Sequence, residues 1–447
     1  MLKKMLIVLL TVILAVSSAV MQDAEQKELE KRQKTLLYGL ETDVTSLIDT
    51  LIKEKDTSFT QDIRTVFDKT SNPAVKEKIF SYYKAIKDKG LQDYALTVLE
   101  DPYDQEKQLV SSVFSYVSEL EIKEAAPFIT ILLRNENEDY FDLALAAIGK
   151  IGNAEDAVFL AEFLKTAELS TARKQALMKT LGQLKAVETW DSLVEIIKDE
   201  DENTYVRMYA AEAIGAMQKE ESIEVLSELF TKTDVNLRTS AVKGLSNFNT
   251  EKTKSIILDA FKDNYYKVRL EAASAAKKYA LTEAVPYLIY RSENDPENTV
   301  KYACYDALGS INNEEAREFL RKTLENKKIN DTSRAKAASV ILENSISDLY
   351  SSVITAAQET LKDDKLKNLR YAIGKEIAKY EIPDFSGICA EYLAHKDVAT
   401  KGTGIDIFMK NNYPDLVPVI QAIAANEKEG SNQRKAKLAL EKAGLSY

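Results

Sequence analysis

The decisive stretch of this sequence is Thr204-Tyr-Val-Arg-Met-Tyr-Ala-Ala-Glu-Ala-Ile-Gly-Ala-Met217. A second copy runs from Thr299 to Ile311, and a third runs from Phe141 to Ile151. Each copy is rich in small residues and ends in an Ile-Gly or Leu-Gly pair, with an aliphatic residue two positions later. The pattern predicts a helix with a narrow apolar face that a neighbouring helix can approach closely.

The copies recur at a nearly fixed period. Their aliphatic anchors are separated by 31, 33, 33, 31, 31, 32 and 33 residues. A fixed period in this range is typical of a solenoid, in which stacked units share one continuous core. The anchors are Val117, Ile148, Leu181, Ile214, Leu245, Ala276, Leu308 and Ile341.

A second helix is expected after each anchor. Aliphatic residues recur there at i, i+3 or i+4 and i+7, as at Ala157, Leu160 and Leu164. Pro127 and Pro286 fall at the first turn of such helices, where a missing N–H is harmless. We therefore predict an all-α fold, an α-solenoid of about ten stacked antiparallel helix pairs. Carboxylates that can cap the first helices are Asp201, Asp234, Asp263, Asp295 and Asp331.

This repeat resembles the HEAT-repeat superfamily, and more closely the short HEAT-like units named after phycobilin lyases. The matching run is Asp-x(n)-Val-Arg-x-x-Ala-x-x-Ala-Ile/Leu-Gly, which is best kept from Asp201 to Gly215. The resemblance implies that the second helices line a concave face. It also divides the chain into degenerate N-terminal repeats over residues 20–109, regular repeats over 110–345 and irregular C-terminal repeats over 346–447.

The N-terminus has the layout of an export signal. Lys3 and Lys4 precede the apolar run from Met5 to Val16, and small residues lead to an expected cleavage site after Ala19. Residues 1–19 are therefore interpreted as a signal peptide, and the mature protein as periplasmic or extracellular, without stable membrane insertion. An uncleaved anchor is the alternative, since the apolar character resumes after Ala19.

Most catalytic chemistry is excluded by composition. His395 is the only histidine, and Cys304 and Cys389 are the only thiols. HEAT-like deoxyhypusine hydroxylases use several His-Glu pairs to hold two irons, and this chain cannot supply them. The repeat spacing separates the two cysteines too widely for a disulfide, so we expect buried free thiols. We predict no enzyme activity, metal or cofactor, and the net charge of −11 disfavours nucleic acid as a partner.

Two sequence features indicate a binding surface. One position of four successive second helices carries an acid, and Tyr290 holds the same position in the next repeat, with Tyr287 one turn before it. Acids of this kind attract a basic partner, and exposed tyrosines favour recognition. The alternatives are ordinary solvated positions for the acids and core positions for the tyrosines. The candidate partner-binding residues are Glu162, Glu195, Glu228, Asp259, Tyr287 and Tyr290.

A basic ladder on the first helices is interpreted as structural. Each cation follows an Asp of its own unit by three to six residues, so ion pairs within or between layers are expected. The ladder consists of Arg207, Arg238, Arg269, Arg334 and the in-register Lys301.

These patterns favour a non-catalytic exported scaffold that binds a protein or peptide on the concave face. One alternative is a lyase- or chaperone-like protein that holds a small ligand in the groove. Another is a structural envelope spacer that associates through its ends. The oligomeric state and the partner's identity are not encoded in any recognisable pattern.

Overall fold

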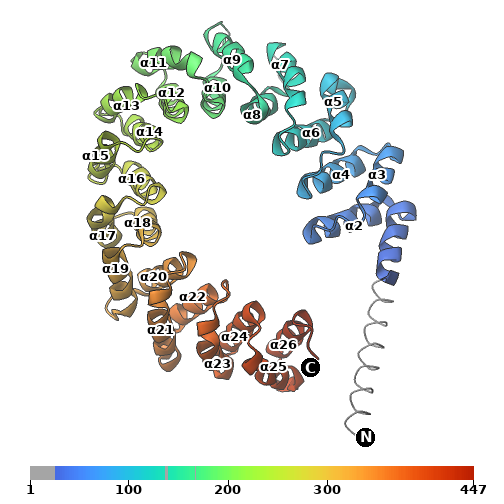
Figure 1. Ribbon diagram of the computed structural model, residues 1–447, viewed down its shortest axis with the longest axis vertical. Coiled ribbons are helices and arrows are strands. Elements are labelled where there is room, and N and C mark those ends of the chain that lie inside the picture. Colours follow the sequence, from blue (N-terminus) through green and yellow to red (C-terminus); the bar gives the residue numbers. More distant parts are fainter. Residues whose placement is uncertain (1–25, 136–138, 167, 447) are drawn as a thin grey trace, which may run out of the picture. The chain divides into compact units, whose positions relative to one another are not determined.

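The computed structural model describes residues 26–135, 139–166 and 168–446, and these residues form helices and turns (Figure 1). The helices follow one another as pairs from α2–α3 to α24–α25, with a helix over residues 26–38 before them and α26 after them. The all-α solenoid prediction is confirmed. Contacts divide the chain into two units, Met1–Lys219 and Glu220–Tyr447, which are described separately.

In the first unit each repeat consists of a first helix followed by an antiparallel second helix. The first helices are α2 (Glu41–Glu54), α4 (Pro73–Ala85), α6 (Lys107–Glu119), α8 (Phe141–Ile151), α10 (Thr171–Leu184) and α12 (Thr204–Met217). The second helices are α3 (Thr60–Lys69), α5 (Gln92–Glu100), α7 (Ala126–Arg134), α9 (Ala154–Thr166) and α11 (Trp190–Lys198). Short 3₁₀ turns lie at η1 (Pro102–Asp104), η2 (Lys123–Ala125) and η3 (Val187–Thr189).

The second unit repeats this organisation. Its first helices are α14 (Val235–Leu245), α16 (Tyr266–Lys278), α18 (Asn298–Ile311), α20 (Asp331–Glu343), α22 (Lys367–Ile377), α24 (Val398–Asn411) and α26 (Ser431–Lys442). Its second helices are α13 (Ser222–Phe230), α15 (Glu251–Ala260), α17 (Val285–Asn294), α19 (Glu314–Glu325), α21 (Tyr350–Lys362), α23 (Ser386–Ala394) and α25 (Val417–Ala425). Its 3₁₀ turns are η4 (Thr282–Ala284), η5 (Ser347–Leu349), η6 (Asp364–Leu366), η7 (Pro383–Phe385), η8 (Pro414–Leu416) and η9 (Glu427–Glu429).

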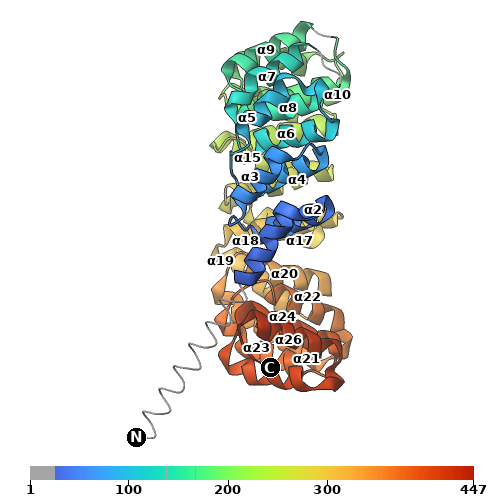
Figure 2. The ribbon, with the colours of Figure 1, turned by 90° about the vertical axis from the view of Figure 1, so that its right-hand side faces the viewer.

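The first helices form the inner layer of each unit taken by itself, and the second helices form the outer layer (Figure 1). Seen from the side, α4, α6 and α8 stack in chain order (Figure 2). The expectation that second helices line the concave side is therefore wrong. The physical reason is the small residues of the first helices, which let that layer pack more closely and so become the shorter side of the curve.

Two glycines show how closely neighbouring helices approach one another. A Cβ added to Gly182 of α10 would lie 3.0 Å from the Ala213 Cα of α12. A Cβ added to Gly404 of α24 would lie 2.8 Å from the Leu393 backbone nitrogen. Both distances are shorter than ordinary van der Waals contact, so at these positions only glycine allows the observed helix spacing.

First helices end in a left-handed residue at several repeats. Lys185, Gln218, Asn312 and Asn412 are C-caps with φ between 51° and 58°. This conformation stops the helix and turns the chain toward the second helix. The helix starts are capped by side chains: Asp234 caps α14 as expected, whereas α12 and α20 are capped by Asn203 and Asn330 in place of Asp201 and Asp331.

The basic ladder is structural, and it is more deeply buried than exposed pairs would be. Arg269 forms two hydrogen bonds of 2.6 and 2.7 Å with Asp295 of the next repeat, and its side chain is 5% exposed. Arg334 likewise binds Glu359 and the Leu324 carbonyl oxygen at the end of α19. Each guanidinium therefore joins the end of one second helix to the following repeat, which confirms pairing between layers.

The two thiols are free and buried, as predicted. Burial raises the pKa of both Cys304 and Cys389 to about 12, so neither is a reactive thiolate near neutral pH. Within the residues that the structure describes, none of the helices combines the length and apolar character needed to cross a bilayer. The predicted signal over residues 1–19 lies outside the described residues.

Candidate functional site

The acidic positions predicted from the repeat register are all exposed, but they lie on the outer layer. Glu162 and Glu195 belong to α9 and α11 of the first unit, and Glu228 and Asp259 belong to α13 and α15 of the second. Their side chains face solvent because the neighbouring i±1 and i±2 positions, such as Leu193 and Val194, fill the core. The concave location proposed for them is therefore corrected to the outer surface.

The two predicted tyrosines lie close to Asp259, and together they form a small surface. Tyr287 stacks on Phe261 with ring centroids 5.8 Å apart and ring planes at 25°. The Lys262 ammonium lies 5.6 Å from the Tyr287 centroid and 2.9 Å from an Asp259 carboxylate oxygen. This lysine joins two residues that the sequence selected separately.

Tyr290 is the exposed part of this surface. Its side chain is 58% exposed, one turn after the half-buried Tyr287. The Arg291 guanidinium lies 5.5 Å from the Tyr290 ring centroid and donates a 2.8 Å hydrogen bond to the Phe261 carbonyl oxygen. We name these five residues the α15–α17 surface: Asp259, Lys262, Tyr287, Tyr290 and Arg291.

A buried ion pair next to this surface holds Arg291 in position. Asp295, whose side chain is 0% exposed, binds Arg269 and lies 3.7 Å from Arg291. Its carboxylate also accepts the Glu297 N–H in the turn that leads into α18. The Arg291 position is thus fixed by the Phe261 carbonyl and by Asp295, so Tyr290 is presented on a rigid element.

The α15–α17 surface can bind but carries no catalytic group. It offers two tyrosine side chains, one ammonium, one guanidinium and one carboxylate, which are typical components of a protein-binding surface. The sequence analysis missed Lys262 and Arg291. Their positions relative to the tyrosines depend on how α15 packs against α17, and a repeat register does not specify this.

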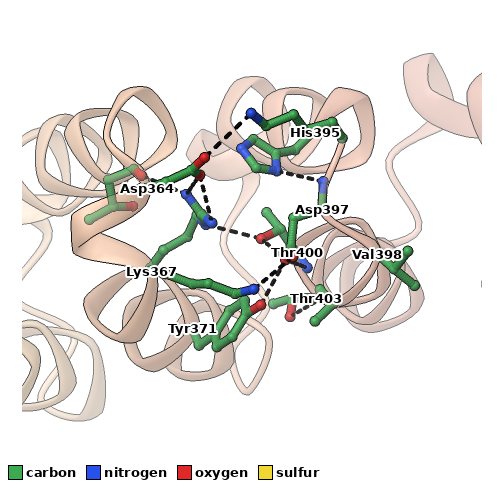
Figure 3. Close-up of polar contacts among 12 residues, drawn as sticks. Asp364, Lys367, Tyr371, His395, Asp397, Val398, Thr400 and Thr403 are labelled. Carbon is green, nitrogen blue, oxygen red and sulfur yellow. Dashed lines mark hydrogen bonds and ion pairs between the residues drawn. The ribbon is translucent and has the colours of Figure 1, made fainter.

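His395, the only histidine, lies in a separate polar network between successive repeats (Figure 3). It is the C-cap residue of α23, and its Nδ1 accepts a 3.0 Å hydrogen bond from the Asp397 N–H. Asp397 in turn accepts hydrogen bonds from Thr400 and from the Tyr371 hydroxyl, and pairs with Lys367 at 3.1 Å. We call these residues the His395 network.

The electrostatics of the His395 network are those of a helix cap. Burial, together with the nearby positive charge of Arg370, lowers the pKa of His395. Burial alone would raise the pKa of Asp397, but hydrogen bonds from Thr400, Tyr371 and Lys367 lower it strongly. The imidazole Nδ1 accepts a backbone hydrogen bond and the Asp397 carboxylate caps α24, so the network joins two successive repeats.

Two surface hollows are lined mainly by charged side chains. One, of about 700 Å³, lies at the start of α19, and the other, of about 380 Å³, includes the predicted Glu195 together with Lys174, Asp199 and Glu202. In the second hollow burial alone would raise the pKa of Glu202, but hydrogen bonds from Lys174 and from the Asn203 N–H, with the positive charge of Lys174, together lower it. Among the described residues, no group of three or more His, Cys, Asp and Glu side chains is arranged to hold a metal ion.

Comparison with known proteins gives a match over nearly the whole chain. The model of the family described as "Spirochaete HEAT repeat protein" matches residues 36–439. Deoxyhypusine hydroxylase-B of Oryza sativa subsp. japonica is 30% identical over 125 residues, which cover 28% of this chain and 41% of the hydroxylase. The chain therefore spans about two fifths of that relative's length.

Solved structures of similar fold include a karyopherin and a phycocyanin lyase complex. The karyopherin Kap121p, bound to the extreme C-terminus of the protein phosphatase Cdc14p, is 12% identical with a TM-score of 0.42, over 92% of this chain and 53% of Kap121p. The CpcE–CpcF complex of phycocyanin lyase from Nostoc sp. PCC7120 is 14% identical with a TM-score of 0.32, over 51% of this chain and 88% of the matched chain.

Proposed function

Because this chain belongs to the spirochaete HEAT repeat protein family, we propose that it is an exported, non-catalytic scaffold that binds a protein or peptide. The supporting observation is Tyr290, a 58% exposed aromatic side chain held in place by Arg291 on a helix whose other face is buried. Exposed, rigid tyrosines give large contact area at low entropic cost, and they are enriched among residues that dominate binding energy. The proposed contact residues are those of the α15–α17 surface.

The composition of the chain supports a non-catalytic role. The single histidine uses its Nδ1 for a backbone hydrogen bond, and both cysteines are buried, so neither residue type resembles an activated nucleophile or its base. The hydroxylase relative and the lyase of similar fold make a small-ligand role the alternative. The two hollows described above are lined mainly by charged side chains, whereas ligand pockets are mostly apolar. A third hollow of about 220 Å³ is lined largely by apolar side chains, among them Leu36, Val44, Val66 and Val75, and it is the place where a small ligand would be sought.

A cross-linked pull-down from the cell envelope tests the proposal. The bait is the mature chain from Val20, compared with Tyr290→Ala and with Tyr205→Ala, a control tyrosine on α12 that is 56% exposed. We expect a specific partner that Tyr290→Ala loses and Tyr205→Ala retains. Equal capture by all three baits would contradict a role for the α15–α17 surface, and absence of any captured protein would contradict the scaffold.

A further inference from the structure

Three exposed aliphatic side chains occur in consecutive repeats of the first unit. Ile131 on α7 is 54% exposed, Val158 on α9 is 42% exposed and Val187 in η3 is 46% exposed. The elements that carry them are neighbours. Thr130 of α7 donates a 2.7 Å hydrogen bond to Asp156 of α9, and α9 packs against η3. The three side chains therefore lie on adjoining elements of one outer surface.

In the repeat that follows each of these three residues, the equivalent position carries an acidic residue. The residue equivalent to Ile131 in the next repeat is Glu162. For Val158 the equivalent is Asp191, and for Val187 it is Glu220. An aliphatic residue at each of these solvent-facing positions adds nothing to the core, and it costs hydration of apolar surface.

The three positions form a diagonal strip. In the register of the α9 repeat, Ile131 corresponds to position 162, Val158 is in place, and Val187 corresponds to position 154. From each repeat to the next, the exposed aliphatic residue therefore lies one helical turn closer to the start of its helix. One turn is about 5–6 Å along the helix, and neighbouring helices lie about 8–10 Å apart, which gives steps of about 10–12 Å. Residues i and i+7 of an α-helix are separated by about 10.5 Å, so one face of a bound helix matches this spacing.

Carboxylates surround the strip. The strip elements α9 and η3, together with the adjoining η2 and α11, expose six carboxylates: Glu124, Glu155, Glu162, Glu188, Asp191 and Glu195. The exposed cations on η2, α7, α9 and α11 are Lys123, Arg134, Lys165 and Lys198, and the Arg134 guanidinium lies 4.6 Å from the Phe159 ring centroid. A partner that covers the strip must therefore present positive charge around its apolar residues.

From this arrangement we infer that the strip of Ile131, Val158 and Val187 is a docking site for a basic amphipathic helix of a partner protein, with apolar residues at i, i+7 and i+14. The inference rests on the proposed binding role and names a second contact surface for it. Such helix-in-groove recognition takes its affinity from the apolar anchors, and its selectivity from the surrounding charge.

The test uses a synthetic helical Leu/Lys peptide of about 21 residues, with leucines at i, i+7 and i+14, and a second peptide with Glu in place of every Lys. Trp190, the only tryptophan, lies three residues after Val187 and reports binding through its fluorescence. We expect the Lys peptide to bind the full chain and the Glu peptide not to bind. Val158→Asp should weaken binding by at least tenfold.

The direction in which Val158→Asp changes peptide binding distinguishes docking at the strip from general electrostatic attraction. Val158→Asp adds a negative charge, which would strengthen nonspecific binding of a cationic peptide, whereas docking predicts weakening. Val398→Asp is the matched control, because Val398 is a 61% exposed valine on α24 of the second unit. Equal binding by the two variants, equal binding of the two peptides, or no binding of the Lys peptide would overturn the inference. None of these results depends on Tyr290, so the scaffold proposal is judged separately.

Discussion

At the scale of single residues, two glycines on the adjacent helices α23 and α24 have opposite expected effects on stability. A Cβ at Gly404 would lie 2.8 Å from the Leu393 nitrogen and 3.0 Å from the Tyr392 carbonyl carbon, whereas a Cβ at Gly387 meets no atom within 4 Å. We expect Gly404→Ala to lower the free energy of unfolding by about 1–3 kcal/mol through overpacking. Gly387→Ala should raise it by up to about 1 kcal/mol, because alanine favours the helix. Urea unfolding of both variants measures the difference, and equal effects would contradict the packing argument.

His395 gives the chain a defined pH dependence. Its pKa is lowered from the ordinary value of 6.5, so the folded state binds fewer protons than the unfolded state near that pH. Stability from this residue is therefore complete above about pH 6.5, and is lost as the pH falls toward the folded-state pKa. The single imidazole allows a direct measurement by proton NMR, in which a pKa at or above 6.5 would contradict the prediction. His395→Gln should remove this part of the pH dependence.

At the scale of elements, the helix ends can be improved. Ala280, which follows α16, has a φ of 47°, a conformation that is unfavourable for residues with a Cβ. We expect Ala280→Gly to raise the free energy of unfolding by about 0.5–1 kcal/mol, since glycine adopts this conformation without steric cost. Thermal unfolding followed by circular dichroism tests this. A lower melting temperature would show that the turn does not depend on this residue's backbone angle.

The buried arginine ladder is expected to contribute more than the surface pairs. Asp295→Ala would leave the buried Arg269 without its partner, and removing one member of a buried pair costs about 3–5 kcal/mol. Asp259→Ala removes an exposed partner of Lys262 and should change stability far less. Chemical denaturation of the two variants provides the comparison. Similar effects would mean that burial does not determine the strength of these pairs.

The sequence predicted the repeat architecture because its period is carried by residues with strong geometric consequences, such as the Ile-Gly pair at Ile214. It failed to predict which helices form the inner layer, because the curvature depends on the relative spacing of the two layers. For the candidate site, the register selected Asp259, Tyr287 and Tyr290. Lys262 and Arg291 were missed because their contacts depend on the packing of α15 against α17.

At the scale of the whole molecule, stability should be distributed by repeats. In a solenoid each repeat contacts only its neighbours, so stability is approximately the sum of repeat and nearest-neighbour terms. A defect in the second unit therefore destabilises nearby repeats first. The single tryptophan, Trp190, belongs to the first unit. Its fluorescence therefore reports the unfolding of that unit, whereas circular dichroism reports the loss of helix along the whole chain.

This independence can be measured with the Asp295→Ala variant, whose defect lies in the second unit. In urea, far-ultraviolet circular dichroism should show early loss of part of the helical signal, while the Trp190 fluorescence transition stays near its position in the unmodified chain. The separation of the two curves is expected because more than a hundred residues of repeats lie between Trp190 and Asp295. If both curves shift together to lower urea, the repeats unfold as one cooperative structure, and the nearest-neighbour description of this chain is wrong.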